Sequence, residues 1–218
     1  MILTNRLFER QAPSREAKSL YIFCEGKERE YKYFKYFEGI DSRINVEVNK
    51  LNPHDDNSPK GLFDLAENSF IGDKPKFTLQ ENDEVWIVLD SDPDKSNSRE
   101  EQIKKIRSEC DLKENWFVVE SNPCFEVWLF FHQNDKVEEF ESDDVCKSWK
   151  KKVNESYEGG FDSRRHPIFI EEAIENAERN FKTNQNRKPL KGSSEVYRLA
   201  KSIFSVTKDK IRKVKNNL

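Results

Sequence analysis

The sequence predicts an α/β protein, with a mostly parallel sheet flanked by helices and a helical C-terminal extension. Short apolar segments rich in β-branched and aromatic residues, such as Val85–Leu89, are typical of strands buried on both faces of a parallel sheet. Amphipathic segments lie between them, and a repeated strand–helix–strand order implies right-handed crossovers. After residue 135 the apolar residues recur mainly at helical spacing, which predicts the extension.

The composition is that of a globular protein. The 218 residues are 35% hydrophobic and 36% charged, and 16 Phe, 6 Tyr and 4 Trp supply bulky core material. The net charge of −3 gives no global attraction to nucleic acid, so such a contact would need a local basic patch.

Cysteine spacing and hydropathy predict a cytoplasmic location. The four cysteines are widely spread without a Cys-x-x-Cys pair, so neither a zinc site nor a disulfide framework is expected (Cys24, Cys110, Cys124 and Cys146). The first 19 residues have no apolar signal core, and no 18-residue apolar run occurs, so no contact with a membrane is expected.

The chain divides into three predicted parts. Residues 1–19 are expected to form a loose leader, residues 20–135 the α/β core, and residues 136–218 a helical region packed on that core.

The core begins with the opening of a βαβ unit. Leu20–Cys24 is the first predicted strand, and Glu25-Gly26 ends it. A helix is expected between Lys27 and Glu38, because its aromatic residues are spaced to form one face (Tyr33, Phe34 and Phe37). Asn45–Leu51 alternates apolar and polar residues, which predicts a strand nearer the edge of the sheet.

The remaining core elements alternate between helices and strands. The predicted elements are a short helix at Gly61–Ser69, the central strand Val85–Leu89, a helix at Ser98–Cys110, a strand at Asn115–Glu120, a turn at Ser121–Cys124 and a helix at Phe125–His132.

The C-terminal region contains three predicted helices. They are Ser142–Val153, Ile168–Phe181 and Ser193–Val206, with a loop at Glu158–Pro167. The end of the chain, Lys208–Leu218, carries five basic residues against one acid. Such runs are usually solvated, although together with Arg164 and Arg165 this one would also suit phosphate contacts.

Three aspartates follow the central strand: Asp90, Asp92 and Asp94. In an extended segment, residues two apart point the same way, so Asp90 and Asp92 can both face the space beyond the strand. Ligands of open parallel sheets bind in that space. The alternative is a simple polar turn, because Asp, Ser and Pro are ordinary turn residues, and Asp94 fits that alternative best.

Further acids follow the neighbouring strands. Glu25, Glu120 and Glu126 join Asp90 and Asp92, and parallel strands place their carboxyl ends at one edge. Carboxylates converging there would repel one another without a cation, so Mg²⁺ or Mn²⁺ is the expected cofactor. Such a metal can bind phosphate oxygens and activate water, while a glutamate transfers a proton.

Three motifs in this order resemble the RloB-like family of the Toprim superfamily. They are Cys-Glu-Gly-x-x-x-Glu-x-x-Tyr-Phe (Cys24–Phe34), the Asp-x-Asp after the central strand, and Ser-Asn-Pro-Cys-Phe-Glu-x-Trp-Leu (Ser121–Leu129). A weaker similarity covers Ser193–Phe204. The resemblance implies a Toprim-like, Rossmannoid fold.

The resemblance also implies roles for individual residues. Glu25 would be a general acid/base or metal ligand, with Asp90 and Asp92 as the metal-binding pair. Glu30 would be a further ligand or proton-transfer group. Asn122 and Glu126 match the third motif and would hold or orient ligands. The chain departs from the family pattern at Arg29, where Thr is common, and at Tyr31, where Pro is common.

The expected function is a metal-dependent nuclease. The resemblance to the RloB-like family further implies a bacterial anti-phage or abortive-infection system, with an AAA/ABC-type ATPase as partner. Lys27 or Arg29 would offset charge on the phosphate. A nucleotide- or nucleic-acid-binding subunit driven by that ATPase is the main alternative, and a purely structural α/β protein is the third. DNA, RNA and signalling nucleotides remain open as substrates.

Some of these residues also have ordinary structural interpretations. Glu25-Gly26 suits a strand-ending turn, and Asn122 suits a helix cap. Cys24 and Cys124 are expected to be small core residues. The three histidines are too scattered to predict a site (His54, His132 and His166).

Overall fold

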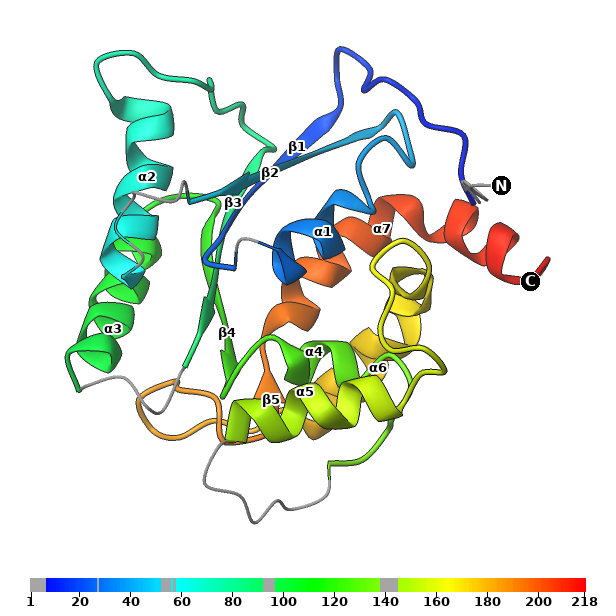
Figure 1. Cartoon of the computed structure of the whole chain (residues 1–218). Coiled ribbons are helices and arrows are strands. Elements are labelled where there is room, and N and C mark those ends of the chain that lie inside the picture. The colour runs from blue at the N-terminus through cyan, green and yellow to red at the C-terminus, as the bar shows by residue number, and fades with distance from the viewer. Residues whose placement is uncertain (1–6, 27, 52–55, 57, 92–96, 138–144) are drawn as a thin grey trace.

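The structure, a computed structural model, describes residues 7–26, 28–51, 56, 58–91, 97–137 and 145–218 (Figure 1). A five-stranded sheet with the order β2-β1-β3-β4-β5 forms its centre. The strands are β1 (Lys18–Cys24), β2 (Ile44–Lys50), β3 (Glu84–Asp90), β4 (Trp116–Asn122) and β5 (Ser193–Ser194). Strands β1 to β4 are parallel, and β5 pairs antiparallel with β4. The predicted α/β fold is therefore confirmed, as is the edge position of β2.

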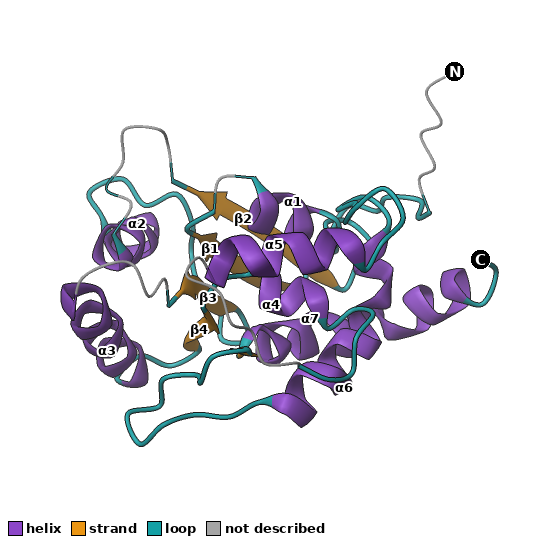
Figure 2. Ribbon diagram, turned by 60° about the horizontal axis from the view of Figure 1, so that its bottom comes forward, coloured by secondary structure: helices purple, strands orange, loops and turns teal. Residues whose placement is uncertain are grey.

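Helices cover both faces of this sheet. They are α1 (Arg29–Lys35), α2 (Pro59–Ile71), α3 (Asn97–Asp111), α4 (Glu126–Phe130), α5 (Val145–Glu155), the 3₁₀ helix η1 (His166–Phe169), α6 (Ile170–Asn180) and α7 (Val196–Lys215). Helices α2 and α3 pack on one face, and the other helices lie on the opposite face (Figure 2). We call these the α2/α3 face and the α1/α4 face.

Alternation along the strands divides the core into two clusters. In β3, Trp86 and Val88 pack on the α1/α4 face, whereas Ile87 and Leu89 pack on the α2/α3 face. This is the period of two that a pleated strand imposes. The same alternation decides to which face each polar residue at the end of a strand points.

The register brings the ends of three strands together. Cys24 at the end of β1 lies opposite Val88, and Asp90 at the end of β3 lies opposite Ser121. The carboxyl ends of β1, β3 and β4 therefore form one edge of the sheet, where open parallel sheets bind their ligands.

The described part of the expected leader contacts the core at several points. Phe8 is buried and packs edge-to-face on Tyr36. The backbone N–H of Gln11 donates to Gly39, and β1 already begins at Lys18. Polar composition hid these contacts, because they depend mainly on backbone groups and one aromatic side chain.

The basic end of the chain is also more ordered than expected. Helix α7 continues to Lys215, and Ile211 within it is fully buried. Lys210, Arg212 and Lys215 form ion pairs with Asp41, Glu171 and Glu172. The charged residues flank the continuing apolar stripe, so most of this run anchors α7 rather than forming a separate tail.

Other predicted elements occur with shifted bounds. Helix α2 is longer than expected because Ser58 accepts a hydrogen bond from Gly61 N and Pro59 occupies the first turn, two features that favour a helix start. The end of the predicted loop at Glu158–Pro167 joins η1, and β5 precedes α7. The first residues of the predicted helix Ser142–Val153, Ser142 to Asp144, lie outside the described residues. Among the described residues, no helix has both the length and the apolarity needed to cross a membrane.

A candidate acidic active site at the carboxyl edge of the sheet

Four carboxylates from separate elements meet at this edge. Glu25 directly follows β1, Asp90 ends β3, and Glu30 and Glu126 stand in the first turns of α1 and α4. Alternation along β3 points Asp90 to the α1/α4 face, from which Glu30 and Glu126 approach. The structure therefore brings together four of the predicted site residues.

Glu30 is buried, and its carboxylate lies against the backbone of Gly26 in the preceding loop. Burial raises the pKa of Glu30 to about 7, and the nearby carboxylates of Glu126 and Glu25 add to that rise. A hydrogen bond from its own backbone N–H and the positive charge of Arg29 act in the opposite direction. This carboxyl group can therefore hold or release a proton near neutral pH.

The pKa of Asp90 is raised by the same two effects, burial and neighbouring carboxylates. Desolvation raises the pKa of Asp90 well above its usual range, and Glu30, Glu25 and Glu126 each contribute to the increase. Carboxylates so close that each opposes the ionisation of the others are stabilised when a cation binds between them.

Two arginines already interact with part of this group. Arg99, from the first turns of α3, is only 5% exposed and pairs with Glu25. It also donates to the backbone oxygen of Asp90, at 3.1 Å from Nε and 2.8 Å from Nη2. Arg29, expected to bind substrate, lies 2.9 Å from Glu126 through Nη1 and Oε1.

Arg99 is a residue that the sequence did not indicate. It lies in a strongly charged stretch, Asn97–Lys105, where nothing distinguishes a buried arginine from exposed neighbours. Its role depends on Glu25, 74 residues earlier, so only the packing of α3 against the ends of β1 and β3 reveals it.

The chemistry of these residues fits a hard divalent cation. Carboxylate oxygens are the donors that Mg²⁺ and Mn²⁺ prefer. Burial first, and then the neighbouring carboxylates, raise the pKa values of Glu30 and Asp90, and a bound cation would offset both effects. Within the described part of the chain, no three His, Cys, Asp or Glu residues stand in an arrangement ready for metal. The arginine pairs of Glu25 and Glu126 account for part of this, because each directs an oxygen to a guanidinium group.

Several predicted residues lie outside the described residues. These are Asp92, the proposed partner of Asp90, and Lys27, the proposed phosphate contact, together with Asp94 and His54.

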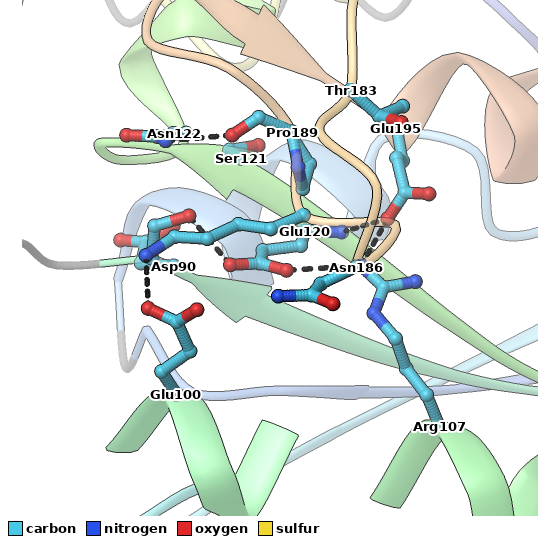
Figure 3. A network of polar contacts seen from close by, with 12 residues as sticks. Asp90, Glu100, Arg107, Glu120, Ser121, Asn122, Thr183, Asn186, Pro189 and Glu195 are labelled. Atoms are coloured by element: carbon cyan, nitrogen blue, oxygen red, sulfur yellow. Dashed lines mark hydrogen bonds and ion pairs between the residues drawn. The ribbon is translucent and has the colours of Figure 1, made fainter. Parts of the chain in front are cut away.

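Glu120 was expected among these acids, and this expectation is wrong. Residue 120 follows Val118 at a spacing of two, so it points to the α2/α3 face. There its Oε1 accepts a hydrogen bond from Ser91 Oγ at 2.5 Å, and its Oε2 accepts one from Arg107 Nη2 at 2.9 Å (Figure 3). Both oxygens are engaged, so Glu120 belongs to a separate network behind the acidic edge.

Asn122 holds a neighbouring segment in place. Its side-chain amide donates to Pro189 O at 2.7 Å, and its backbone oxygen accepts from Gly192 N at 2.8 Å. The N-cap of α4 is Phe125, so Asn122 is not a helix cap. Its position at the end of β4 remains next to the acidic edge.

Arg164 and Arg165, expected to contact substrate, lie in the segment between α5 and η1. Cys146 in the first turn of α5 is near enough to raise the pKa of Asp90. Both arginines follow the end of this helix, at Glu155, by nine and ten residues. Both are exposed, and Arg164 pairs with Asp162 at 3.1 Å.

The described cysteines and histidines have structural surroundings. Cys24 and Cys124 are buried, as expected for core residues. His132 is buried between Tyr33 and the backbone oxygen of Trp128, and His166 stacks on Tyr157.

Comparison with known families agrees with the three motifs. The family described as RloB-like protein matches residues 20–203, which include every described acid of the site. No curated protein and no solved structure matches the chain. Because the family match spans most of the sequence, this chain belongs to the RloB-like family.

Proposed function

We propose that this protein is a Mg²⁺- or Mn²⁺-dependent nuclease that hydrolyses phosphodiester bonds of nucleic acid. The convergence of Glu25, Glu30, Asp90 and Glu126 at the carboxyl edge of the sheet supports this proposal. Four acids at a ligand-binding edge, two of them with raised pKa values, are more than a turn or a helix start requires.

The acids would divide the work between binding and proton transfer. Asp90, with Glu25 and Glu126, would hold the metal ion, which when bound polarises the phosphate and lowers the pKa of a coordinated water. Asp92 follows at a spacing of two and is the proposed fourth ligand. Glu30, whose pKa is about 7, is suited to give a proton to the departing oxygen or to take one from water.

The two arginines would act on the substrate. Arg99 and Arg29 lie against Glu25 and Glu126, within reach of an anion that enters the same edge. A guanidinium matches the geometry of phosphate oxygens. An incoming phosphate would therefore compete with these carboxylates for the arginines and leave the carboxylates to the metal.

The biological setting is proposed from the Toprim-like motifs. It is bacterial anti-phage defence or abortive infection, with the AAA/ABC-type ATPase as activating partner and the cytoplasm as location.

One observation favours a second candidate function. Glu25 and Glu126 are already paired with arginines, and the described residues hold no ready arrangement of three metal-binding side chains. A subunit that binds nucleotide or nucleic acid through Arg29 and Arg99, driven by an ATPase and without cleavage of its own, would need only these pairs.

Cleavage assays with one matched control distinguish the two functions. The substrates are single- and double-stranded DNA, RNA and tRNA, each with Mg²⁺ or Mn²⁺ and with chelator. Asp90→Asn removes the central charge at the carboxyl end of β3. Asp83→Asn is the control, because Asp83 is a buried aspartate just before the other end of the same strand and accepts hydrogen bonds from Ser19 N and Gln80 N.

If the protein is a nuclease, wild type and Asp83→Asn cleave in the presence of metal. Cleavage is lost when chelator is added, and Asp90→Asn does not cleave. The binding subunit predicts no cleavage by any variant, with nucleic acid retained by Asp90→Asn and released by Arg99→Met. Cleavage that survives both chelator and Asp90→Asn would contradict the metal site.

A further inference from the structure

A second buried polar network lies behind the acidic edge, on the α2/α3 face. It consists of Arg107 from α3, Glu120 from β4, Glu195 before α7 and Ser91 after β3, all of which are buried. Figure 3 shows Glu120 between Arg107 and Glu195 on one side and the segment that carries Asp90 on the other.

Arg107 connects the two glutamates. Its Nη2 lies 2.9 Å from Glu120 Oε2 and 2.5 Å from Glu195 Oε2. Each glutamate also donates its backbone N–H to the other. Glu120 N donates to Glu195 Oε2 at 3.1 Å, and Glu195 N donates to Glu120 O at 2.9 Å. The start of α7 is thereby fixed to the last residues of β4.

The network reaches Asp90 through Ser91. Ser91 Oγ donates to Glu120 Oε1 at 2.5 Å, and Ser91 N donates to Ser121 O at 2.8 Å. Arg99 holds the backbone oxygen of Asp90. The peptide that joins Asp90 to Ser91 is therefore held by contacts on both sides, and its orientation decides where the carboxylate of Asp90 points.

Stability alone does not call for such a network. Burying an arginine with two carboxylates has a large desolvation cost, and apolar residues of similar volume often stabilise a core equally well. Burial raises the pKa of Glu195 despite the adjacent Arg107, whereas Glu195 and Glu120 raise the pKa of Arg107 against its burial. The desolvation cost that is not offset therefore lies on Glu195. A buried network with this desolvation cost can instead serve to fix the orientation of nearby side chains.

The adjoining cavity is too small to explain the network as a binding site. Its volume is about 40 Å³, and Ser91, Arg107 and Glu120 are among its lining residues. Such a space suits a few water molecules and excludes a nucleotide.

We propose that Glu195, Arg107 and Glu120 are positioning residues that orient Asp90 through the hydroxyl of Ser91. They link the start of α7 to the acidic edge from behind. The proposal rests on the proposed function only where it concerns metal affinity, because the orientation of Asp90 is a property of the metal-free protein as well.

The test uses Glu195→Gln and Ser91→Ala in the full chain. The readouts are the Mn²⁺ dissociation constant from electron paramagnetic resonance and metal-free backbone hydrogen exchange. Asp41→Asn is the matched control, because Asp41 is another buried carboxylate in ion pairs, with Arg43 and Lys210, at the other end of α7.

The proposal expects both test variants to bind Mn²⁺ about tenfold more weakly, the usual lower limit for loss of a group that orients a metal ligand. Exchange should accelerate in residues 88–91 and 119–122 but not in β1. The double variant Ser91→Ala/Glu195→Gln should bind Mn²⁺ no more weakly than Ser91→Ala alone, because both changes interrupt the same chain of contacts to Asp90. Asp41→Asn should lower the melting temperature without changing the Mn²⁺ dissociation constant.

The opposite pattern would overturn the proposal. In that pattern, Glu195→Gln lowers the melting temperature, leaves the Mn²⁺ affinity at the wild-type value and accelerates hydrogen exchange evenly across the sheet. If the wild-type protein binds no Mn²⁺, the metal site itself is refuted. The exchange pattern then decides the positioning role alone, since localised acceleration supports it and even acceleration refutes it.

Discussion

The carboxylate of Glu30 lies against the backbone of Gly26. A β-carbon at position 26 would stand 1.6 Å from Glu30 Oε2, a distance that no pair of unbonded atoms can adopt. Residue 26 must therefore be glycine for Glu30 to reach the acidic edge. The glycine of the Glu25-Gly26 pair provides space for a side chain four residues later.

Gly26→Ala is expected to abolish the site while preserving the fold. The atoms that the new methyl group meets belong to the end of a flexible side chain, so Glu30 can rotate away at little cost to stability. We expect cleavage to fall at least tenfold and the melting temperature to change little. Both are measured beside Glu30→Ala.

The double variant Gly26→Ala/Glu30→Ala provides the control. If the glycine acts only through Glu30, the double variant cleaves as poorly as Glu30→Ala alone. A further loss in the double variant would mean that Gly26 has another role, such as direct contact with substrate.

Arg99→Met is expected to strengthen metal binding. The guanidinium of Arg99 is a buried positive charge next to Glu25 and the backbone of Asp90, so it opposes the entry of a metal cation. Without Arg99, the peptide between Asp90 and Ser91 is still held through Ser91 N and Ser91 Oγ. Removal of Arg99 should lower the Mn²⁺ dissociation constant on the order of tenfold, since a nearby unit charge contributes more than 1 kcal/mol at protein dielectric. Isothermal titration measures this change.

Arg187→Met is the control for Arg99→Met. Arg187 is an exposed arginine that pairs with Asp111 at the end of α3, 2.6 Å away, and its loss should leave the dissociation constant unchanged. Weaker Mn²⁺ binding by Arg99→Met would show instead that Arg99 holds the carboxylates in their binding arrangement.

His132 is expected to reduce stability in mild acid. Tyr33 Oη lies 3.0 Å from Nε2, and Nδ1 lies 3.2 Å from Trp128 O. Nδ1 therefore carries the proton and Nε2 accepts from the tyrosine. Burial lowers the pKa of His132 to about 3, so the unfolded chain binds a proton below about pH 6.5 while the folded protein does not.

This difference in bound protons makes the free energy of unfolding depend on pH. The free energy of unfolding should fall by about 1.4 kcal/mol for each pH unit as the pH decreases from 6.5 towards the folded pKa. Glu30, with a pKa of about 7 in the folded state, gives a slope of the opposite sign. The measurement is therefore the difference between wild type and His132→Gln in urea unfolding at pH 7.5 and 5.

A constant difference between these two proteins would contradict a neutral His132. His166→Gln is the comparison, because burial also lowers the pKa of His166 but this side chain is partly exposed. Its effect on the pH dependence should be smaller.

Asp41→Asn is expected to loosen the end of α7. Asp41 is buried and pairs with Arg43 at 2.9 Å and Lys210 at 3.2 Å, while Arg43 also donates to Val206 O at 2.8 Å. We expect a loss of about 1–3 kcal/mol in the free energy of unfolding, the usual cost of removing a charged partner from a buried hydrogen bond.

This contribution should also depend on acid pH. Arg43 holds the pKa of Asp41 well below its usual range, so the stabilisation is present above the unfolded pKa and is lost as the pH falls below about 4. Glu178→Gln breaks an exposed pair with Lys201 and should cost less than 1 kcal/mol. Equal losses in both variants would show that the Asp41 contacts do not anchor α7.

The sequence by itself determined the strands and the edge at which the acids gather. Apolar runs such as Val85–Leu89 are local patterns, and parallel strands necessarily end on one side. For this reason Glu25, Asp90 and Glu126 could be assigned to one edge before any contact was known.

Only the tertiary structure decided which face each acid occupies and which cations meet it. Glu120 lies one residue out of phase with the α1/α4 face, so it joins Arg107 behind the site instead of Asp90 within it. Arg99 and Arg107 are spaced eight apart in a helix crowded with charge, and no local pattern marks them as buried. Their partners lie up to 88 residues away, because ion pairs of this kind form only when the whole sheet and its helices have packed.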